Sequence, residues 1–275
     1  MQSGALLANL AVSMNLLGLD VGNTHLHLGV MRGGKVRWRE AVPTPRTHAD
    51  AEGLGVMLQE LAHSSHPPQA IAYCSVVPAA TELLRAVLQA TGWPVFQLTW
   101  EECAPLGLPL EYPHPAQIGQ DRLALAFGAS TFHGKPVVAI DLGTAVTFDV
   151  INHRGAYEGG IIAPGLALMT CYLHERTALL PALDPHDLAT TASIGKSTIE
   201  AMKIGCSAGF AGMIQALLER VLKELRERDE GEVKVVATGG SAVSLSRMGL
   251  GDIIFDPDLL MRGLEEAWRR KHSPK

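Results

Sequence analysis

The chain has 275 residues, of which 47% are hydrophobic and 19% are charged. This length and this apolar content suffice for one large or two ordinary globular domains with buried cores. The formal charge is −5, with 23 Lys and Arg against 28 Asp and Glu, and no basic stripe is present that would neutralise a nucleic-acid backbone. We therefore expect a globular protein whose main partner is not a nucleic acid.

The first part of the chain predicts an antiparallel meander followed by α/β alternation. Three strands are expected at 16–21, 25–31 and 35–42, the last two joined by the turn "RGGK". Helices at 50–63 and 79–91 then alternate with strands in "AIAYCSVV" and "PVFQLT". Alternation of this kind predicts a sheet that becomes partly parallel.

The second part repeats this plan. A helix beginning at residue 121, "DRLALAFGASTF", leads into strands at 136–141 and 145–151. Further elements are expected after them: helices at 166–180 and 198–228, a strand in "VKVVATGG", and a last helix at 257–270. We therefore predict an α/β fold of two duplicated lobes that face each other across a ligand cleft, with the boundary placed at 120/121.

Each lobe opens with a strand that ends in Asp-x-Gly and is followed by a second strand, "LDVGNTHLHLGV" and "IDLGTAVTFDV". Gly22 and Gly143 are expected to allow positive φ and close approach of backbone amides to a phosphate. Asp20 and Asp141, at the strand ends, could hold a cation, since Mg²⁺ uses one or two carboxylates together with substrate phosphates. Short hydrogen-bond donors lie beside them: Asn23, Thr24 and Thr144. The pair of junctions predicts a nucleotide phosphate site.

Cysteine spacing and hydropathy bear on the compartment. The four cysteines are 29, 32 and 35 residues apart and predict buried, reduced thiols: Cys74, Cys103, Cys171 and Cys206. Residues 1–19 have no charge, but the first basic residue is Arg32 and the apolar run leads into Asp20, unlike a secretory signal. No uninterrupted apolar run reaches the length of a membrane span. We expect a cytoplasmic protein that is not bound to a membrane.

Three other motifs have competing interpretations. His25 and His27 share one strand face and suggest a metal site, but we favour an ordinary hairpin surface because no third ligand is near in sequence. "IGKST" at 194–198 resembles a P-loop, yet Thr190 stands where that pattern needs Gly, so we expect a helix start capped by Ser193 or Ser197. "VVATGGSA" is either a site for a flat ligand such as adenine or a tight strand-to-helix turn.

A family resemblance rests on six motifs in order, "DVGNT", "IGQDR", "DLGTAVTFD", "GGIIAPGL", "STIEAMKIG" and "ATGG". Together they resemble type III pantothenate kinases, members of the actin, hexokinase and sugar-kinase superfamily. The resemblance runs from about residue 16 to 262 and leaves 1–15 as an N-terminal extension. It implies two ribonuclease H-like lobes with an actin-like ATPase fold, divided as 16–120 and 121–275. It also implies ATP-dependent phosphorylation of pantothenate to 4′-phosphopantothenate, the first step of coenzyme A biosynthesis.

The resemblance also implies roles for single residues. Asp121 is at the position of the proton acceptor, and Asp141 is at the position of the ligand for a monovalent cation, K⁺ or NH₄⁺. ATP is expected at the first hairpin and one further threonine: Asp20, Val21, Gly22, Asn23, Thr24, His25, Leu26, His27 and Thr144. Pantothenate is expected at a second set: Tyr112, Gly119, Gln120, Asp121, Arg122 and Thr198.

Other readings stay open beside these. Asp121 and Arg122 could simply begin a helix, because Asp is favoured at the positive N-terminal end. Another small-molecule kinase of the superfamily and a non-catalytic regulatory factor, the "Bvg accessory factor" label of this family, are alternative functions. The resemblance further implies Mg²⁺ and a homodimer whose interface contains the pantothenate pocket. The helix segment "GCSAGFAG" at 205–212 would permit close helix approach, either between subunits or within one chain.

Overall fold

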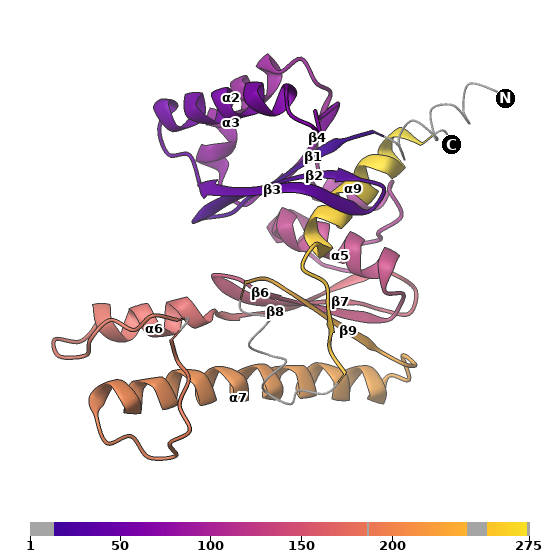
Figure 1. The fold of residues 1–275 in the computed structure, drawn as a ribbon. Coiled ribbons are helices and arrows are strands. Elements are labelled where there is room, and N and C mark those ends of the chain that lie inside the picture. The colour runs from indigo at the N-terminus through magenta and orange to yellow at the C-terminus, as the bar shows by residue number, and fades with distance from the viewer. Residues whose placement is uncertain (1–13, 186, 241–251, 274–275) are drawn as a thin grey trace. The chain divides into compact units, whose positions relative to one another are not determined.

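The computed structural model describes residues 14–185, 187–240 and 252–273 (Figure 1). The chain divides into two compact units. The first contains the described residues up to Gly134, the segment Gly155–Glu158 and the helix that follows Asp258; the second contains Lys135–Arg154 and Gly159–Pro257. This division differs from the expected boundary at 120/121. Most of the expected extension, 1–15, lies outside the described residues.

The first unit contains a five-stranded sheet in the order β3-β2-β1-β4-β5. Its strands are β1 (Leu16–Val21), β2 (His25–Arg32), β3 (Lys35–Pro43), β4 (Ala70–Ser75) and β5 (Val95–Gln97). β2 is antiparallel to both β1 and β3, whereas β4 is parallel to β1 and to β5. The predicted meander and the change to parallel pairing are therefore confirmed.

Helices cover both faces of this sheet (Figure 1). They are α2 (His48–Ala62), α3 (Pro78–Ala90), α4 (Trp100–Cys103), the 3₁₀ turn η1 (Pro115–Gln117), α5 (Gln120–Phe132) and α9 (Leu259–His272). Leucines of α2 and α3, such as Leu58 and Leu84, pack on Leu19 and Ile71 of the sheet. α5 and α9 lie on the opposite face, where Met261 and Leu264 approach Gly18 of β1.

The last helix therefore belongs to the first unit, although the sequence analysis placed 121–275 in the second lobe. α9 packs lengthwise on α5, and two glycines make this close packing sterically feasible. A Cβ on Gly263 would overlap the carbonyl oxygen of Ala124, and a Cβ on Gly128 would overlap the carbonyl oxygen of Leu259. The difference from the expectation thus has a packing cause, which sequence order alone does not reveal.

The second unit has a sheet in the order β10-β9-β6-β7-β8. Its strands are β6 (Val137–Leu142), β7 (Ala145–Ile151), β8 (Tyr157–Pro164), β9 (Lys234–Thr238) and β10 (Ile254–Phe255). β6 is antiparallel to β7 and parallel to β9, as β1 is to β2 and β4. The order read from β8 equals that of the first sheet read from β3, so the predicted duplication is confirmed. β8 and β10 were not predicted.

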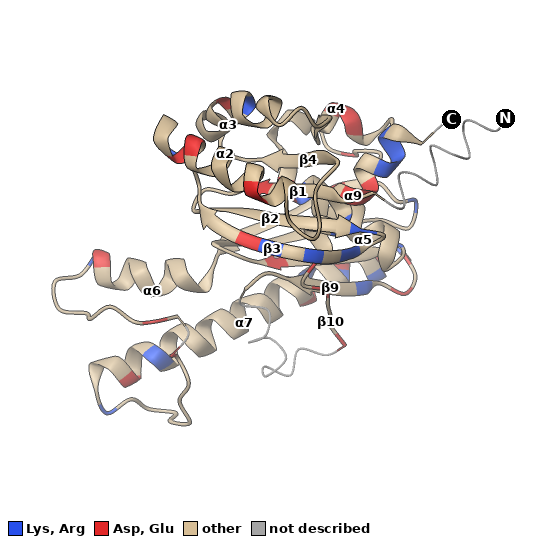
Figure 2. Ribbon diagram, turned by 45° about the horizontal axis from the view of Figure 1, so that its top comes forward, with Lys and Arg blue, Asp and Glu red and all other residues tan. Residues whose placement is uncertain are grey.

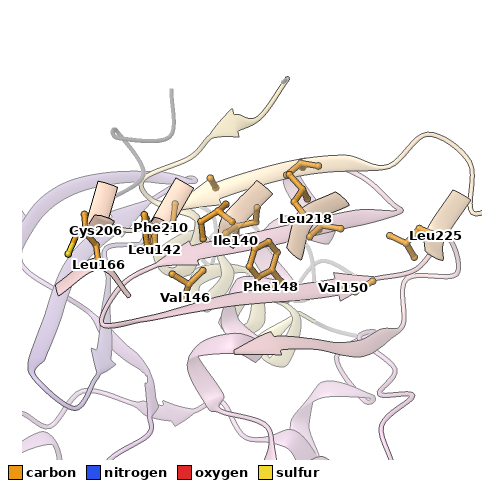
Figure 3. Packing of buried hydrophobic residues seen from close by; sticks show 14 of the residues in the cluster. Ile140, Leu142, Val146, Phe148, Val150, Leu166, Cys206, Phe210, Leu218 and Leu225 are labelled. Carbon is orange, nitrogen blue, oxygen red and sulfur yellow. The ribbon is translucent and has the colours of Figure 1, made fainter. Parts of the chain in front are cut away.

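The core of the second unit lies between this sheet and the helices α6 (Leu166–Glu175) and α7 (Thr198–Glu227). Figure 3 shows Phe210 and Leu218 of α7 directed at Ile140 and Phe148 of the sheet. α7 is 30 residues long and apolar enough to meet the length and composition of a membrane span. Its buried residues recur along one face that packs on the sheet, as in an amphipathic surface helix of a globular protein: Met202, Cys206, Phe210, Ile214, Leu218 and Leu225.

The four thiols are free. Cys74, Cys103 and Cys206 are buried as predicted, but Cys171 on α6 is exposed. Burial raises the pKa of Cys103 to about 12, with help from the neighbouring carboxylates of Glu102 and Glu101. The buried thiols are therefore held in the protonated, unreactive form at neutral pH.

Candidate active site

The first Asp-x-Gly hairpin joins β1 to β2. Asp20 lies opposite His27 of β2 on one side and beside Cys74 of β4 on the other. The N–H of Gly22 donates to the carbonyl oxygen of His25 over 3.0 Å and closes the turn. Gly22 does not have a positive φ, contrary to our expectation. Glycine is favoured at this position for a steric reason instead, because a Cβ would lie only 3.0 Å from the His25 carbonyl oxygen.

Thr44, just after β3, holds this hairpin in place. Its hydroxyl donates to the carbonyl oxygen of Gly22 over 2.6 Å, and its N–H donates to that of Thr24 over 3.1 Å. Thr44 is itself buried. Thr44 was not predicted from the sequence because it lies 20 or more positions after the hairpin turn and belongs to no motif.

The side chains of the predicted ATP-binding hairpin point in two directions. Val21 and Leu26 are buried in the core, so only their backbone atoms remain available to a ligand. The polar side chains between and after them are exposed: Asn23, Thr24, His25 and His27. A turn with exposed polar groups on a rigid buried base fits a site for a charged ligand.

His25 and His27 lie on the same exposed face, with ring centroids 6.1 Å apart. Partial burial, and secondarily the charge of His25, lowers the pKa of His27. In the parts of the chain that the structure describes, no three His, Cys, Asp or Glu side chains are grouped as metal ligands would be. A hairpin surface therefore stays our interpretation of this pair.

Asp20, Cys74 and Asp121 lie close together in the first unit. The Sγ of Cys74 is 3.6 Å from Oδ1 of Asp20 and donates to it. Burial raises the pKa of Cys74 well above its usual value, and the negative charges of Asp20 and Asp121 raise it further. The carboxylates assigned from the sequence to ATP binding and to proton abstraction are thus both near enough to Cys74 for their charges to act on it.

Asp121 stands in the first turn of α5, whose N-cap is Gly119. Its Oδ1 accepts the N–H of Arg122 over 2.8 Å. Burial raises the pKa of Asp121 above the usual range for Asp, although this hydrogen bond and the charge of Arg122 oppose the effect. A Cβ on Gly119 would overlap Oδ1 of Asp121, so glycine is required for the carboxylate to lie where it does. A partly buried carboxyl with a raised pKa is suited to general-base chemistry.

Two of the predicted pantothenate residues meet at an aromatic side chain that the sequence analysis did not select. Tyr157 is fully buried at the start of β8. The guanidinium of Arg122 lies 5.9 Å from its ring centroid, and the ring of Tyr112 lies 6.4 Å from it. The N–H of Tyr157 donates to the Pro109 carbonyl and its own carbonyl accepts from Glu111, which fixes the strand beside Tyr112. In the sequence, the only sign of this residue was an aromatic side chain directly before "EGG".

The second Asp-x-Gly hairpin lies in the second unit. Asp141 is the last but one residue of β6, in register with Thr147 of β7 and Thr238 of β9. Gly239 has φ +94°, and a Cβ on it would lie 2.6 Å from Oδ1 of Asp141, so the glycine lets the backbone approach this carboxylate. Thr144 is exposed in the turn, and Gly143 does not have the expected positive φ.

The motifs "APGL" and "VVATGGSA" also belong to the second unit. A Cβ on Gly165 would overlap the carbonyl oxygens of Gly143 and Thr144, so "APGL" brings the start of α6 against the hairpin. In "VVATGGSA", residues 241 and 242 lie outside the described residues. The role of its glycines toward adenine stays a prediction.

The "IGKST" segment begins a helix and is not a P-loop. Ser197 is the N-cap of α7, and its hydroxyl accepts the N–H of Glu200 over 3.2 Å. Thr198 is the exposed first residue of α7. The expected cap at Ser197 is therefore confirmed.

The duplicated sheets define a class of proteins, those with the actin-like ATPase fold. Over 96% of this chain, the structure resembles component A of (R)-2-hydroxyglutaryl-CoA dehydratase from Acidaminococcus fermentans, covering 100% of that chain with a TM-score of 0.55 and 16% identity. A ROK family glucokinase from Streptomyces griseus, in complex with glucose and AMPPNP, has a TM-score of 0.50 and 13% identity over 92% of this chain and 97% of its own. These similarities establish the fold.

Sequence comparison gives the family. The family model for type III pantothenate kinase matches residues 16–220. A type III pantothenate kinase of Akkermansia muciniphila is 40% identical over 92% of this chain and 98% of its own, and one of Methylacidiphilum infernorum is 37% identical over 90% and 85%. The chain belongs to the type III pantothenate kinase family.

Proposed function

We propose that this protein transfers the terminal phosphoryl group of ATP to the primary hydroxyl of pantothenate, the first step toward coenzyme A. Family membership supports the reaction. The observation that carries the mechanism is the position of Asp121, a partly buried carboxylate beside Cys74 and Asp20 at the start of α5. The cytoplasm is the compartment that we propose for it.

Asp121 accepts the proton of the pantothenate hydroxyl. Phosphoryl transfer has a loose transition state, so the proton leaves late and the carboxylate mainly orients the nucleophile. The raised pKa makes the carboxylate a stronger proton acceptor than an exposed Asp. Pantothenate has one carboxylate. Arg122 supplies a cation to bind it, and Tyr112, which lies beside Tyr157, supplies an aromatic surface. The backbone of Gly119 and Gln120 and the Thr198 side chain complete the proposed contacts.

The first hairpin holds the triphosphate. Its exposed polar side chains and backbone N–H groups are donors for phosphate oxygens, and Thr44 keeps the turn rigid. The Asp20 carboxylate fits Mg²⁺, which prefers oxygen ligands and commonly uses one carboxylate together with phosphates. The ion would neutralise charge on the transferred phosphate. Thr144, exposed in the second hairpin, is the further ATP contact that we propose.

Asp141 fits a monovalent cation. Its carboxylate lies close to Gly239 and Gly143, since a Cβ built on these glycines would be 2.6 and 3.8 Å from Oδ1. One carboxylate has a single negative charge, which would balance the charge of one K⁺ or NH₄⁺. The cation would offset part of the negative charge of the nucleotide.

The test of the function is coupled ADP release with pantothenate, compared with a panel of sugars and acetate, in KCl and in NaCl of equal ionic strength. Of these acceptors, we expect only pantothenate to give ADP release. Turnover should be lower by about tenfold or more in NaCl than in KCl, because one electrostatic contact to the transition state is lost. Release with a sugar but not with pantothenate would indicate another kinase of the superfamily. No release with any acceptor would favour a regulatory protein.

Asp141→Ala separates the cation site from the rest of the machinery. The variant should lose the difference between KCl and NaCl as well as turnover. Asp184→Ala, a charge removal at an exposed position of the same unit, is the matched control and should keep both. A full potassium dependence in Asp141→Ala would contradict the proposed site.

A homodimer is also proposed, and an open apolar face of the second unit supports it. A groove of about 500 Å³ runs between α6 and α7, lined by Leu168, Met169, Cys171, Tyr172, Leu173, Gly205 and others. Leu168 is 45% and Tyr172 61% exposed, more than expected for large side chains on one helix. Figure 2 shows charge on α6 only at its C-terminal end. Apart from the backbone of α7 itself, no atom of the described residues lies within 4 Å of a Cβ built on Gly205 or Gly212.

Sedimentation tests the dimer. We expect twice the 29.4 kDa chain mass at assay concentrations, and a shift to the single chain mass in Leu168→Asp, because a buried unpaired charge is costly. Val56→Asp, at an apolar position of α2 that is 56% exposed, is the matched control and should remain dimeric. A parent protein that sediments as a monomer would refute the proposal.

A further inference from the structure

The side chain of Gln120 is directed at the ends of two strands. Its Oε1 accepts two hydrogen bonds, from the N–H of Ser75 over 2.9 Å and from Nε2 of Gln97 over 3.1 Å. Oε1 of Gln97 in turn accepts from the hydroxyl of Tyr73 over 2.9 Å. Tyr73 and Ser75 lie on β4, and Gln97 is the last residue of β5. One amide oxygen therefore ties the first residue of α5 to the carboxyl ends of β4 and β5.

Within the first turn of α5, the Asp121 carboxylate accepts the N–H of Arg122, but this contact does not reach the sheet. The N-cap of α5, Gly119, has no side chain and makes no capping hydrogen bond. Glycine is nevertheless required there, since a Cβ would overlap the Asp121 carboxylate. The first turn of a helix has unsatisfied N–H groups and frays unless something anchors it. Gln120 supplies that anchor from the side of the helix.

The anchored turn contains Asp121. Gln120 is its immediate neighbour, and Asp121 is partly buried near Cys74, one residue before Ser75 on β4. Ser75 is itself held firmly, because its Oγ accepts the Val77 N–H over 3.1 Å and the Thr81 hydroxyl over 2.6 Å. The hydrogen bonds of Gln120 thus join the catalytic turn to a rigid strand end.

We propose that Gln120 is a positioning residue for the reaction, whose hydrogen bonds to Ser75 and Gln97 hold the Asp121 carboxylate in line with the substrate hydroxyl. The proposal rests on the proposed function of Asp121 as proton acceptor. Small misplacements of a reacting group are costly, up to about 100-fold in rate for 1 Å. Loss of the Gln120 oxygen frees the turn and exposes the carboxylate.

The test compares Gln120→Ala with Gln120→Glu. Gln120→Ala should lower kcat by roughly 10- to 100-fold and leave the KM for ATP within about twofold. It should also move the acid limb of the kcat profile to lower pH, because a more exposed carboxylate has a lower pKa. Gln120→Glu keeps an acceptor for Ser75 and Gln97, so kcat on the plateau should return to within about threefold of the parent. Its added negative charge should move the acid limb the opposite way, to higher pH.

Gln89→Ala, on the exposed side of α3, is the matched control and should change neither kcat nor the pH profile. A Gln120→Ala variant with kcat and acid limb like the parent's, whatever its melting temperature, would overturn the proposal. So would a Gln120→Glu variant that stays as slow as the alanine variant.

A readout without substrate separates this proposal from the proposed function. In protein labelled with ¹³C-aspartate, the Asp121 carboxyl is titrated by NMR in the parent and in Gln120→Ala. A fall of its pKa in the variant supports the anchoring role even if the parent shows no ADP release with pantothenate, which would refute the proposed function alone. An unchanged titration refutes the anchoring.

Discussion

Asp121→Asn is expected to lower turnover by about 100- to 10,000-fold, the range found when a general base is removed. Asparagine keeps the shape of the side chain and one oxygen for the Arg122 N–H, which Oδ1 of Asp121 accepts at 2.8 Å. It cannot take up a proton. ATP binding should persist, because the hairpin and Asp20 are unchanged. Coupled ADP release and nucleotide titration measure the two properties separately.

The alternative role of Asp121, a simple helix start, makes a different prediction for stability. Burial raises the pKa of Asp121, so the ionised carboxylate favours the unfolded state as pH rises through the folded pKa. Removing the charge should therefore leave the free energy of unfolding at pH 7 unchanged or higher. Asp50→Asn is the matched control, because Asp50 caps α2 through the N–H groups of Arg46 and Thr47. It should lose stability and keep turnover.

The same pKa shift fixes the direction of the pH dependence. A proton acceptor must be ionised, and the Asp121 pKa lies above the usual Asp value of about 3.9. The acid limb of kcat should therefore lie above about pH 4 and be absent from the residual activity of Asp121→Asn. Turnover of the variant within about threefold of the parent would remove Asp121 from the mechanism.

The sequence predicted the repeated part of this fold because its signals are local. Strand, Asp-x-Gly and strand occur twice in 14 or 15 consecutive residues, and hydrophobic periodicity places the meanders without knowledge of the rest. β8 was missed because "EGGII" combines two glycines with few alternating polar residues. The positive φ predicted for the glycines of both hairpins was wrong; at Gly22 it is the neighbouring backbone that leaves no room for a side chain.

The candidate site was only partly predictable. Motifs located Asp20 and Asp121. That both lie near Cys74 of β4, whose pKa both of their charges raise, depends on how the chain folds. Thr44, Gln97 and Tyr157 belong to no motif and act through hydrogen bonds or packing over long separations. Such contacts are set by the tertiary fold, which local propensity does not encode.

The place of α9 is the clearest case of this limit, and Gly263→Ala tests it. A Cβ on Gly263 would overlap the Ala124 carbonyl and come within 3.0 Å of the Gly128 nitrogen, both on the backbone of α5. Backbone of a helix cannot yield as a flexible side chain can, so α9 must move away from α5. Overpacking typically costs about 1–3 kcal/mol, and we expect the upper end, about 3 kcal/mol, in denaturant unfolding.

The control is Gly53→Ala in α2, where a Cβ would have no neighbour within 4 Å. The same chemical change should there stabilise the protein by roughly 0.8–1 kcal/mol, because alanine favours the helix over glycine. If the free energy of unfolding falls in Gly263→Ala and rises in Gly53→Ala, the contact between α9 and α5 is separated from the effect of helix propensity. If Gly263→Ala were as stable as the parent, α9 could not pack on α5 as the structure has it, and the first unit would end before Asp258. A loss in Gly263→Ala with a gain in Gly53→Ala instead requires the C-terminal helix to complete the unit that contains Asp20 and Asp121.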